Sequence, residues 1–218
     1  MKAITATRGN FMKNTRWLVV GIIAFALCAT PMMGAETAEG FIPLFNGKDL
    51  AGWKKVHPDN NKNSKRSGWK AENGLLVNMA AGCDLATVEK FADFELHFEY
   101  RIPGGGNSGV YLRGRYEIQI MDDCGKRPSR QSTGSVYDLI PPSVNASGPA
   151  MEWQTVDVKL VGKQVTVRLN GKTIIEDAEL PFVTKGAMSS NVNMPGPIML
   201  QGLISPVVFR NLRIKPVK

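Results

Sequence analysis

The sequence is poor in histidine and cysteine. Two histidines, His57 and His97, and three cysteines occur among its 218 residues. No two cysteines stand at the Cys-x-x-Cys spacing that is typical of zinc sites, so the sequence predicts no metal site of that kind. Beyond residue 35 only Cys83 and Cys124 remain, and the sequence leaves open whether they form a disulfide or are two buried thiols.

Long hydrophobic stretches are scarce as well. The apolar run at residues 17–29 is too short to span a bilayer comfortably. Lys13 and Arg16 precede this run, and small residues follow it up to Ala35, which is the layout of a secretory signal peptide. We therefore expect residues 1–35 to be a cleaved signal peptide.

The expected mature chain, residues 36–218, is one exported domain without a transmembrane span. Met12 is an alternative start, because it places the charged residues immediately before the apolar run. Acylation of Cys28, as in a lipoprotein, is the alternative to simple cleavage, but Leu27 stands where a small residue is usual.

The positive charge belongs largely to this first segment. Removing residues 1–35 lowers the number of lysines and arginines from 27 to 23 against 19 acidic residues, so the net charge falls from +8 to +4. An excess this small does not favour a nucleic-acid partner.

Helical periodicity is missing beyond residue 40, and no internal repeat or linker is present. Short apolar–polar alternations are separated instead by Gly, Pro and Asn turns, which is typical of an all-β sandwich or barrel. The clearest strand covers residues 91–102, and Asn73-Gly74 and Asn170-Gly171 predict tight hairpins. We expect a two-sheet antiparallel sandwich with a core that includes Leu96, Phe98, Val110, Leu112, Ile118, Ile120, Val165, Val167 and Leu169.

The stretch PGGGNSGVYLRGRYEIQIMDD, residues 103–123, has one apolar face and one polar face. Its even-numbered apolar residues must face the core, so Arg113, Glu117 and Gln119 are expected to share the opposite face. On a continuous strand Gln119 lies about 7 Å from Glu117 and Arg113 about 13 Å from it, so all three are expected to reach one ligand. The glycine run lets a ligand approach the backbone closely, and Asn107 adds a donor.

Six ordered blocks resemble the 3-keto-disaccharide hydrolase family, also called domain of unknown function 1080. They are FIPLFNGKDLAGWK, DFELHFEYRIPGGGNSGVYLRG, YEIQIMDD, TGSVYDLIPP, EWQTVDVKLVGKQVTVRLNGKTI and GPIMLQG…SPVVFRNLRI, and they cover about residues 40–217. The resemblance implies a concanavalin A-like, glucanase-like jelly roll, exported to the periplasm or envelope of a bacterium. It also implies action on glycosides whose C3 hydroxyl has been oxidised to a ketone.

One segment departs from the family pattern. Many members that look like this carry Asp or Glu, then His-Gly, after the LQG of the penultimate strand. Here the positions are Gly202, Leu203, Ile204 and Ser205, with neither an acid nor an imidazole.

A ketone at C3 acidifies the C2 proton, so a positioned base can remove it. The C1 substituent then leaves by β-elimination, and water adds back. Such a site needs a base, a cation or donor at O3, and an acid for the leaving oxygen. Under this hypothesis the candidate catalytic residues are Glu117, Arg113 and Glu99. The candidate sugar-binding residues are Gln119, Asn107, Tyr137 and Gln201.

The role of Glu117 as base requires partial burial, which is expected to raise its pKa. Tyr137, in the long loop after residue 121, is either an aromatic platform for the sugar ring or a packing residue. Asp122 is either a turn residue or, together with Glu117, a ligand of a divalent cation.

Three alternatives to the lyase or hydrolase hypothesis remain open. The first is a non-catalytic carbohydrate-binding jelly roll, and the second is an envelope interaction protein without a pocket. The third is ordinary two-carboxylate hydrolysis, for which Glu99 and Glu117 are the candidate pair. The expected partner is a sugar or 3-keto-sugar, with no organic cofactor and no nucleic acid. The sequence gives no indication of the oligomeric state.

Overall fold

The computed structural model describes residues 40–56, 68–79, 82–192, 194–202 and 205–217. All of these residues lie in one compact unit, residues 37–218. The expected signal peptide, residues 1–35, lies outside the described residues, so its cleavage and the export of the chain stay predictions. In the described part of the chain no helix is long and apolar enough to cross a membrane.

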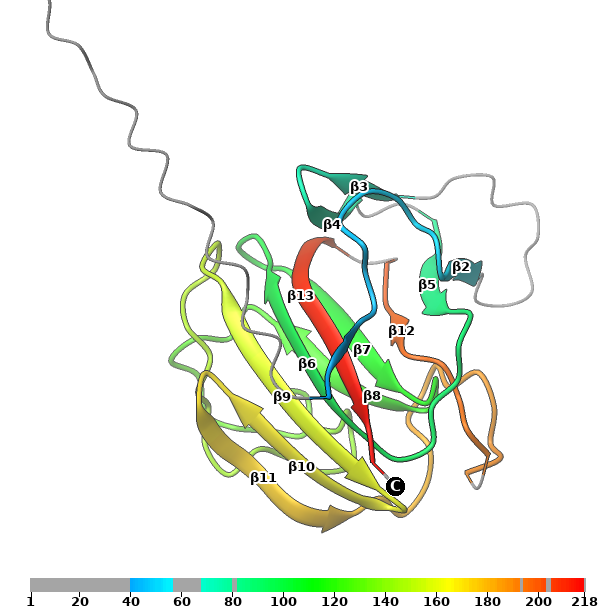
Figure 1. Cartoon of the computed structure of the whole chain (residues 1–218). Coiled ribbons are helices and arrows are strands. Elements are labelled where there is room, and N and C mark those ends of the chain that lie inside the picture. Colours follow the sequence, from blue (N-terminus) through cyan, green and yellow to red (C-terminus); the bar gives the residue numbers. More distant parts are fainter. Residues whose placement is uncertain (1–39, 57–67, 80–81, 193, 203–204, 218) are drawn as a thin grey trace, which may run out of the picture. The chain divides into compact units, whose positions relative to one another are not determined.

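The described residues form β-strands that alternate with turns and loops (Figure 1). The strands are β1 (Ile42–Pro43), β2 (Trp53–Val56), β3 (Trp69–Glu72), β4 (Leu75–Met79), β5 (Asp84–Thr87), β6 (Phe94–Arg101), β7 (Asn107–Leu112), β8 (Tyr116–Met121), β9 (Gln154–Val161), β10 (Gln164–Leu169), β11 (Lys172–Glu179), β12 (Met199–Leu200) and β13 (Pro206–Pro216).

These strands make two antiparallel sheets. The larger sheet has eight described strands in the order β11-β10-β9-β6-β13-β4-β3, with β1 paired to β13. The smaller sheet has five, in the order β2-β5-β12-β7-β8. The predicted hairpins at Asn73-Gly74 and Asn170-Gly171 join β3 to β4 and β10 to β11, and all four residues have positive φ, as a tight two-residue turn requires.

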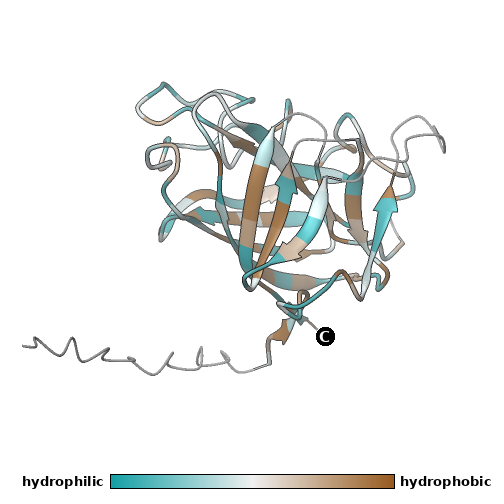
Figure 2. Ribbon diagram, turned by 90° about the horizontal axis from the view of Figure 1, so that it is seen from above, coloured by the Kyte–Doolittle hydropathy of each residue, from teal (hydrophilic) through white to brown (hydrophobic). Residues whose placement is uncertain are grey.

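The core lies between the two sheets. Inward-facing residues of both sheets, such as Phe98 of β6 and Ile118 of β8, belong to one buried hydrophobic cluster. Hydrophobic and hydrophilic positions alternate along the strands (Figure 2), so each sheet has an inner and an outer face. All nine residues of the expected core are buried. The prediction of a two-sheet antiparallel sandwich is confirmed.

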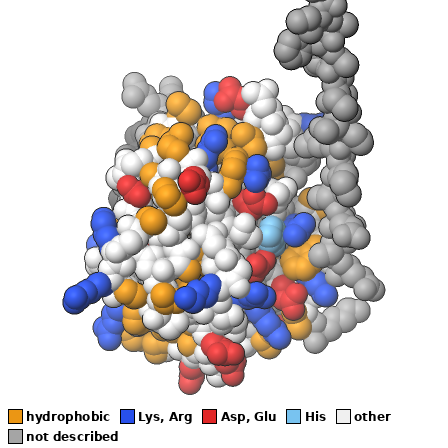
Figure 3. All heavy atoms as spheres, turned by 90° about the vertical axis from the view of Figure 1, so that its left-hand side faces the viewer, with side chains coloured by type: hydrophobic (Ala, Val, Ile, Leu, Met, Phe, Trp, Pro, Cys, Tyr) orange, Lys and Arg blue, Asp and Glu red, His pale blue; other side chains and the backbone are white. Residues whose placement is uncertain are grey.

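The outer face of the larger sheet carries paired charges. His97 Nδ1 lies 2.7 Å from Asp157 Oδ1, and Arg210 lies 2.6 Å from the carboxylate of Glu99. Figure 3 shows a face of the molecule on which basic and acidic side chains are interspersed among neutral ones. On that face neither sign of charge is gathered into one large patch.

The two cysteines beyond residue 35 are not joined to each other. Cys83 is completely buried and belongs to the core, whereas Cys124 is exposed in the turn after β8. Both alternatives of the sequence analysis are therefore wrong for Cys124, which is neither bridged to Cys83 nor buried. The physical reason is that one side chain faces the core and the other faces solvent.

Candidate active site

The polar face of the β7–β8 hairpin is buried although it points away from the core. Tyr116, Ile118 and Ile120 face inward, so Glu117 and Gln119 lie on the outer face of the smaller sheet. Even so, Glu117 is only 4% exposed and Gln119 only 2%. Other segments of the chain must therefore cover this face.

Two loops supply the cover by bonding to the free edge of β8. The Tyr137 amide donates to the Glu117 carbonyl at 2.9 Å, and the Gln119 amide donates to the Ser135 carbonyl at 3.0 Å. Farther along the edge, the Glu117 amide donates to the hydroxyl oxygen of Thr184 at 3.0 Å. Because the unpaired backbone groups of an edge strand must find partners, these bonds hold both loops beside the outer face.

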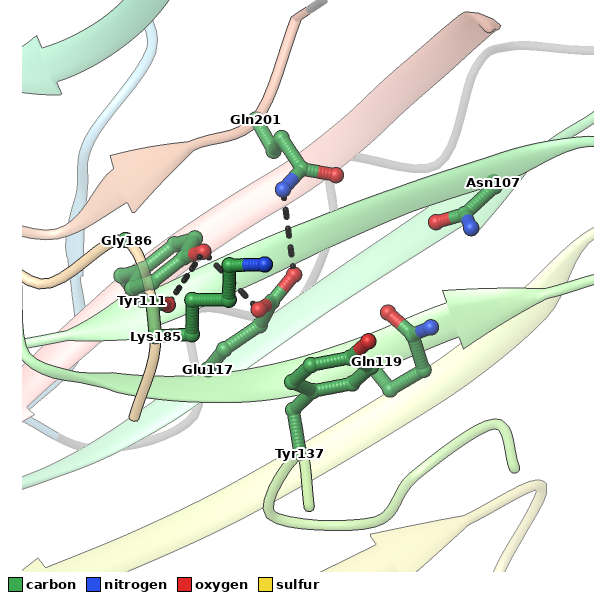
Figure 4. A pocket seen from close by; sticks show the side chains of 8 residues that line it. All are labelled: Asn107, Tyr111, Glu117, Gln119, Tyr137, Lys185, Gly186 and Gln201. Atoms are coloured by element: carbon green, nitrogen blue, oxygen red, sulfur yellow. Dashed lines mark hydrogen bonds between the residues drawn. The ribbon is translucent and has the colours of Figure 1, made fainter. Parts of the chain in front are cut away.

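A cavity of about 250 Å³ lies between the sheet and these loops (Figure 4). It is smaller than the ~300–1,000 Å³ that is usual for ligand pockets, so it suits one sugar ring better than a chain of rings. Its lining residues come from β7, β8, both loops and the segment after β12, and they are Asn107, Tyr111, Glu117, Gln119, Tyr137, Lys185, Gly186 and Gln201.

The Glu117 carboxylate is held on the floor of this cavity by two side chains. The Tyr111 hydroxyl donates to Oε2 at 2.8 Å, and the Gln201 amide donates to Oε1 at 3.3 Å. Gly109 of β7 lies directly beneath, because a Cβ atom there would stand 2.9 Å from the carboxyl carbon of Glu117. The missing side chain of Gly109 is therefore what lets Glu117 lie across the neighbouring strand.

This environment favours the protonated form of Glu117. Burial raises the pKa of Glu117 to about 7, and the negative charges of Asp84 and Asp138 act in the same direction. The hydrogen bond from Tyr111 opposes the rise by stabilising the carboxylate. The rise agrees with the expectation from the sequence, and a carboxyl group with a pKa near 7 is matched to proton transfer at neutral pH.

Two acceptors in the cavity wall lack hydrogen bonds. Oε1 of Gln119 and Oε1 of Gln201 are buried and have no partner among the described residues. Buried polar atoms are nearly always satisfied, so an unpaired acceptor in a cavity is available to a donor from a ligand or from water. Sugar hydroxyls are such donors.

Arg113 does not line this cavity, so the expectation that it shares one ligand site with Glu117 is wrong. The strand ends at Leu112, and Arg113 and Gly114 form a turn in which both φ angles are positive. The Arg113 guanidinium donates instead to the carbonyls of Ala92 and Gly162 and pairs with Asp93 at 2.7 Å. The separation expected along a continuous strand does not apply, because β7 and β8 are two strands of a hairpin.

Glu99 does not join the site either. Its neighbour Phe98 and the neighbour of Glu117, Ile118, both face the one core between the sheets. Glu99 and Glu117 therefore point to opposite outer faces of the sandwich, and Glu99 binds Arg210. The expectation that Glu99 and Glu117 form the two-carboxylate pair of ordinary glycoside hydrolysis is therefore wrong.

Five of the seven expected residues do lie together. Glu117, Gln119, Asn107, Tyr137 and Gln201 all line the cavity. Sequence reasoning missed Tyr111 and Lys185. A signal existed for Tyr111, since residues 107, 109 and 111 alternate onto the face that Glu117 and Gln119 share once β7 pairs with β8. No local pattern marks Lys185, which arrives on the loop that Thr184 fixes to β8.

The structure gives Asp122 a local role. Its Oδ2 atom accepts a hydrogen bond from the Gly105 amide at 2.8 Å, which ties the glycine run to the end of β8. No cluster of three or more His, Cys, Asp or Glu side chains suitable for a metal is found among the described residues. A divalent cation at Asp122 stays an untested expectation.

Comparison with known proteins gives one family match and one curated relative. The model of a family described as 3-keto-alpha-glucoside-1,2-lyase-like domain matches residues 40–215. A 3-keto-disaccharide hydrolase of Bacteroides thetaiotaomicron is 26% identical in an alignment of 175 residues, which covers 64% of this chain and 59% of that protein. The match thus spans less than two thirds of that relative's length.

Solved structures agree on the fold. A candidate glycosyl hydrolase from Parabacteroides distasonis is 29% identical with a TM-score of 0.67, over 82% of this chain and 84% of that one. A β-glucanase of Bacillus licheniformis, 13% identical, has a TM-score of 0.51 over 82% of this chain and 97% of that one. The glucanase-like jelly-roll class predicted from the sequence is confirmed.

Proposed function

The chain belongs to the 3-keto-alpha-glucoside-1,2-lyase-like domain family, and from that premise we propose that its cavity binds one 3-keto-sugar ring and that Glu117 removes the C2 proton. The observation that carries this proposal is a buried carboxyl group with a pKa near 7 on the floor of a cavity the size of one ring. The relative from Bacteroides thetaiotaomicron, a 3-keto-disaccharide hydrolase, supports the same substrate class.

The proposed reaction begins with transfer of the C2 proton to Glu117, which leaves an enolate with its charge on O3. The ketone then re-forms as the C2–C3 electrons move to make a C1–C2 double bond, and the C1–oxygen bond breaks. The leaving oxygen takes up a proton and departs as an alcohol. Addition of water across the C1–C2 double bond completes a net hydrolysis, whereas release before this addition makes the reaction a lyase reaction.

The side chains around Glu117 have complementary tasks in this scheme. Lys185 extends over Tyr111 toward Glu117 (Figure 4), and its ammonium group is the positive charge that lines the cavity and can stabilise the enolate. It takes the place that the sequence analysis had given to Arg113. In this proposal the unpaired amide oxygens of Gln119 and Gln201 accept hydrogen bonds from sugar hydroxyls, and Tyr137, which lines the cavity, is the platform for the ring.

Tyr111 can form a hydrogen bond with Glu117 in both protonation states of the carboxyl group. Its hydroxyl has one proton and lies within reach of two acceptors, Glu117 Oε2 at 2.8 Å and the Lys185 carbonyl at 3.1 Å. When Glu117 is ionised, the hydroxyl donates to it. When Glu117 has taken the C2 proton, the Tyr111 oxygen can accept that proton in a hydrogen bond while its own proton turns to the Lys185 carbonyl. Both protonation states of Glu117 therefore keep a partner.

The test is turnover of an aryl 3-keto-glucoside by the purified protein and by the variant Glu117→Gln, followed by release of the phenol. Because removal of a general base costs about 10²–10⁴-fold, we expect the variant to lose at least about 100-fold in kcat. Its affinity for the unoxidised glucoside, measured by calorimetry, should change little, since Gln keeps the shape and can still accept from Tyr111. Glu95→Gln, on the outer face of the larger sheet, is the control with the same change of charge. Unchanged turnover in Glu117→Gln would remove Glu117 from the mechanism.

A second candidate function is sugar binding without turnover. It is favoured by the segment Gly202–Ser205, which has no acid or imidazole where many related sequences carry them. The same experiment separates the two functions. A wild-type protein that binds the aryl 3-keto-glucoside but releases no phenol would be a binding module.

A further inference from the structure

A second, larger cavity of about 680 Å³ opens beside the smaller sheet. One register row crosses this sheet from β2 to β8, through Lys54, Ala86, Met199, Tyr111 and Glu117. Residues that pair directly across strands present their side chains to the same face. Lys54, which lines the second cavity, is therefore on the same outer face as Glu117, about 19 Å away between Cα atoms across four strand spacings.

Positive charge dominates the lining of the second cavity. Lys54, Lys90, Arg113 and Arg115 contribute to it, and among the described residues no Asp or Glu does. Arg113 is neutralised by Asp93. For the other three cations no salt bridge with a carboxylate occurs within the described residues. The cavity therefore holds a net positive charge that its own walls leave uncompensated.

Arg115 is the most unusual member of this group. It is only 4% exposed, and its Nη1 atom donates to the Met194 carbonyl at 2.7 Å. Its Nε atom is buried without a hydrogen-bond partner. A buried guanidinium with neither a carboxylate nor a full set of acceptors is costly, and an anion bound against it would remove that cost.

The remaining lining comes from the segment before β12 and combines the polar residues Ser189 and Asn191 with apolar ones. Met188 and Met194 are 42% and 56% exposed, and Pro195 and Pro197 lie beside them. Large apolar side chains exposed at a cavity indicate a contact surface for a ligand. Cations next to methionine and proline fit an anionic group on an apolar or ring-shaped body better than a bare inorganic anion.

We propose that the second cavity binds a carboxylate, sulfate or phosphate group carried by the part of the glycoside that is attached to C1 of the sugar. The assignment of this part of the substrate rests on the proposed function. Arg115 lies in the turn that leads into β8, two residues before Glu117, and lines the second cavity. In this proposal the sugar ring lies over Glu117 and its C1 substituent enters the second cavity on the same outer face. The cations there favour acidic over neutral leaving groups.

The first experiment measures anion binding without any turnover. Benzoate is titrated into the purified protein by calorimetry, with benzyl alcohol as the neutral probe and inorganic sulfate as the small anion. The variant is Lys54→Met with Lys90→Met, because both lysines are exposed and their loss leaves the core intact. We expect benzoate to bind more tightly than either comparison probe, and to bind about fivefold or more weakly in the double variant.

The matched control removes two positive charges elsewhere. Lys159→Met with Lys172→Met changes two exposed lysines on β9 and β11 of the larger sheet. Its affinity for benzoate should equal that of the wild type. Equal benzoate affinity in all three proteins, or no benzoate binding by the wild type, would overturn the anion site.

The second experiment tests which part of a substrate enters the cavity. Rates are compared for 4-carboxyphenyl and phenyl 3-keto-glucosides, and kcat/KM should favour the acidic substrate about fivefold or more in the wild type but not in Lys54→Met with Lys90→Met. Equal rates in the wild type would overturn the assignment to the C1 substituent. Failure of both substrates, together with benzoate binding that depends on the two lysines, would refute the proposed function and still support the anion site.

Discussion

At the scale of single residues, the Glu117 carboxylate depends on a position that has no side chain. Gly109 pairs with Gln119 across the hairpin, and the Glu117 side chain lies over it. The φ angle of Gly109 is not in the left-handed region, so its backbone accepts any residue. Space for the carboxylate, rather than backbone freedom, is therefore what glycine provides here.

Gly109→Ala should displace the Glu117 carboxylate without unfolding the protein. The added Cβ would stand 2.9 Å from the carboxyl carbon, which forces the side chain to move. A misplacement of about 1 Å costs on the order of 100-fold in rate, so we expect a loss of that size in kcat/KM with an unchanged far-ultraviolet circular dichroism spectrum. Gly104→Ala is the control, because its Cβ would meet only Asp122 at an ordinary 4.0 Å. Wild-type turnover in Gly109→Ala would show that the position of Glu117 is not critical.

The raised pKa of Glu117 predicts opposite effects of pH on activity and on stability. Activity should rise with pH through about 7, since only the ionised form is a base. Between pH 4.5 and 7 the folded state keeps a proton that the unfolded state has lost, so the free energy of unfolding should fall as pH increases. A shift from 4.5 to about 7 corresponds to about 3 kcal/mol in total. Urea titrations at pH 5 and pH 8 should show this decrease for the wild type and a smaller one for Glu117→Gln. Identical decreases would contradict the raised pKa.

At the scale of secondary-structure elements, the site depends on the hairpin and on which sheet each strand joins. The turn at Arg113-Gly114 removes Arg113 from the polar face, and the free edge of β8 fixes the loops that carry Tyr137 and Lys185. β6 runs in the other sheet, so its outward carboxylates face away from the cavity.

Glu99→Gln should consequently leave turnover of the aryl 3-keto-glucoside within about twofold of wild type. The variant loses a partly exposed ion pair with Arg210, and such pairs contribute about 0–1 kcal/mol to stability. Kinetics and a urea titration on the same sample measure both effects. A large loss of turnover in Glu99→Gln, with unchanged stability, would show that Glu99 takes part in catalysis.

At the scale of the whole molecule, the sandwich separates groups that the sequence places on equivalent strands. The core between the sheets takes Cys83, while the turn beyond β8 exposes Cys124. The same geometry puts the Glu117 cavity and the cationic cavity on one outer face and the His97–Asp157 and Glu99–Arg210 pairs on the other.

Thiol titration tests this placement of the cysteines. In a Cys28→Ser background, Ellman's reagent should modify one thiol per native chain, Cys124, and a second only after unfolding in guanidinium. The Tm should not change when dithiothreitol is added. Two inaccessible thiols that appear only after reduction would mean that Cys83 and Cys124 are bridged.

By itself the sequence determined the sandwich, its core and the site residues that β8 contributes, Glu117 and Gln119. Alternation with a period of two decides which residues of a strand face inward, and Asn-Gly pairs decide where strands turn, because both effects act between neighbours in the chain. Glu117 and Gln119 were predictable for this reason. Tyr111 is predictable as well once the register between β7 and β8 is known.

Only the tertiary structure decided which polar residues meet. Whether β6 and β8 lie in one sheet, and whether Arg113 continues a strand or turns away to Asp93, depends on contacts between residues far apart in the sequence. Lys185 reaches the cavity through the bonds of Thr184 to β8, from a segment with no periodicity of its own. A strand's outer face looks the same in sequence whether it meets solvent or a covering loop, because burial there is set by partners that local patterns do not encode.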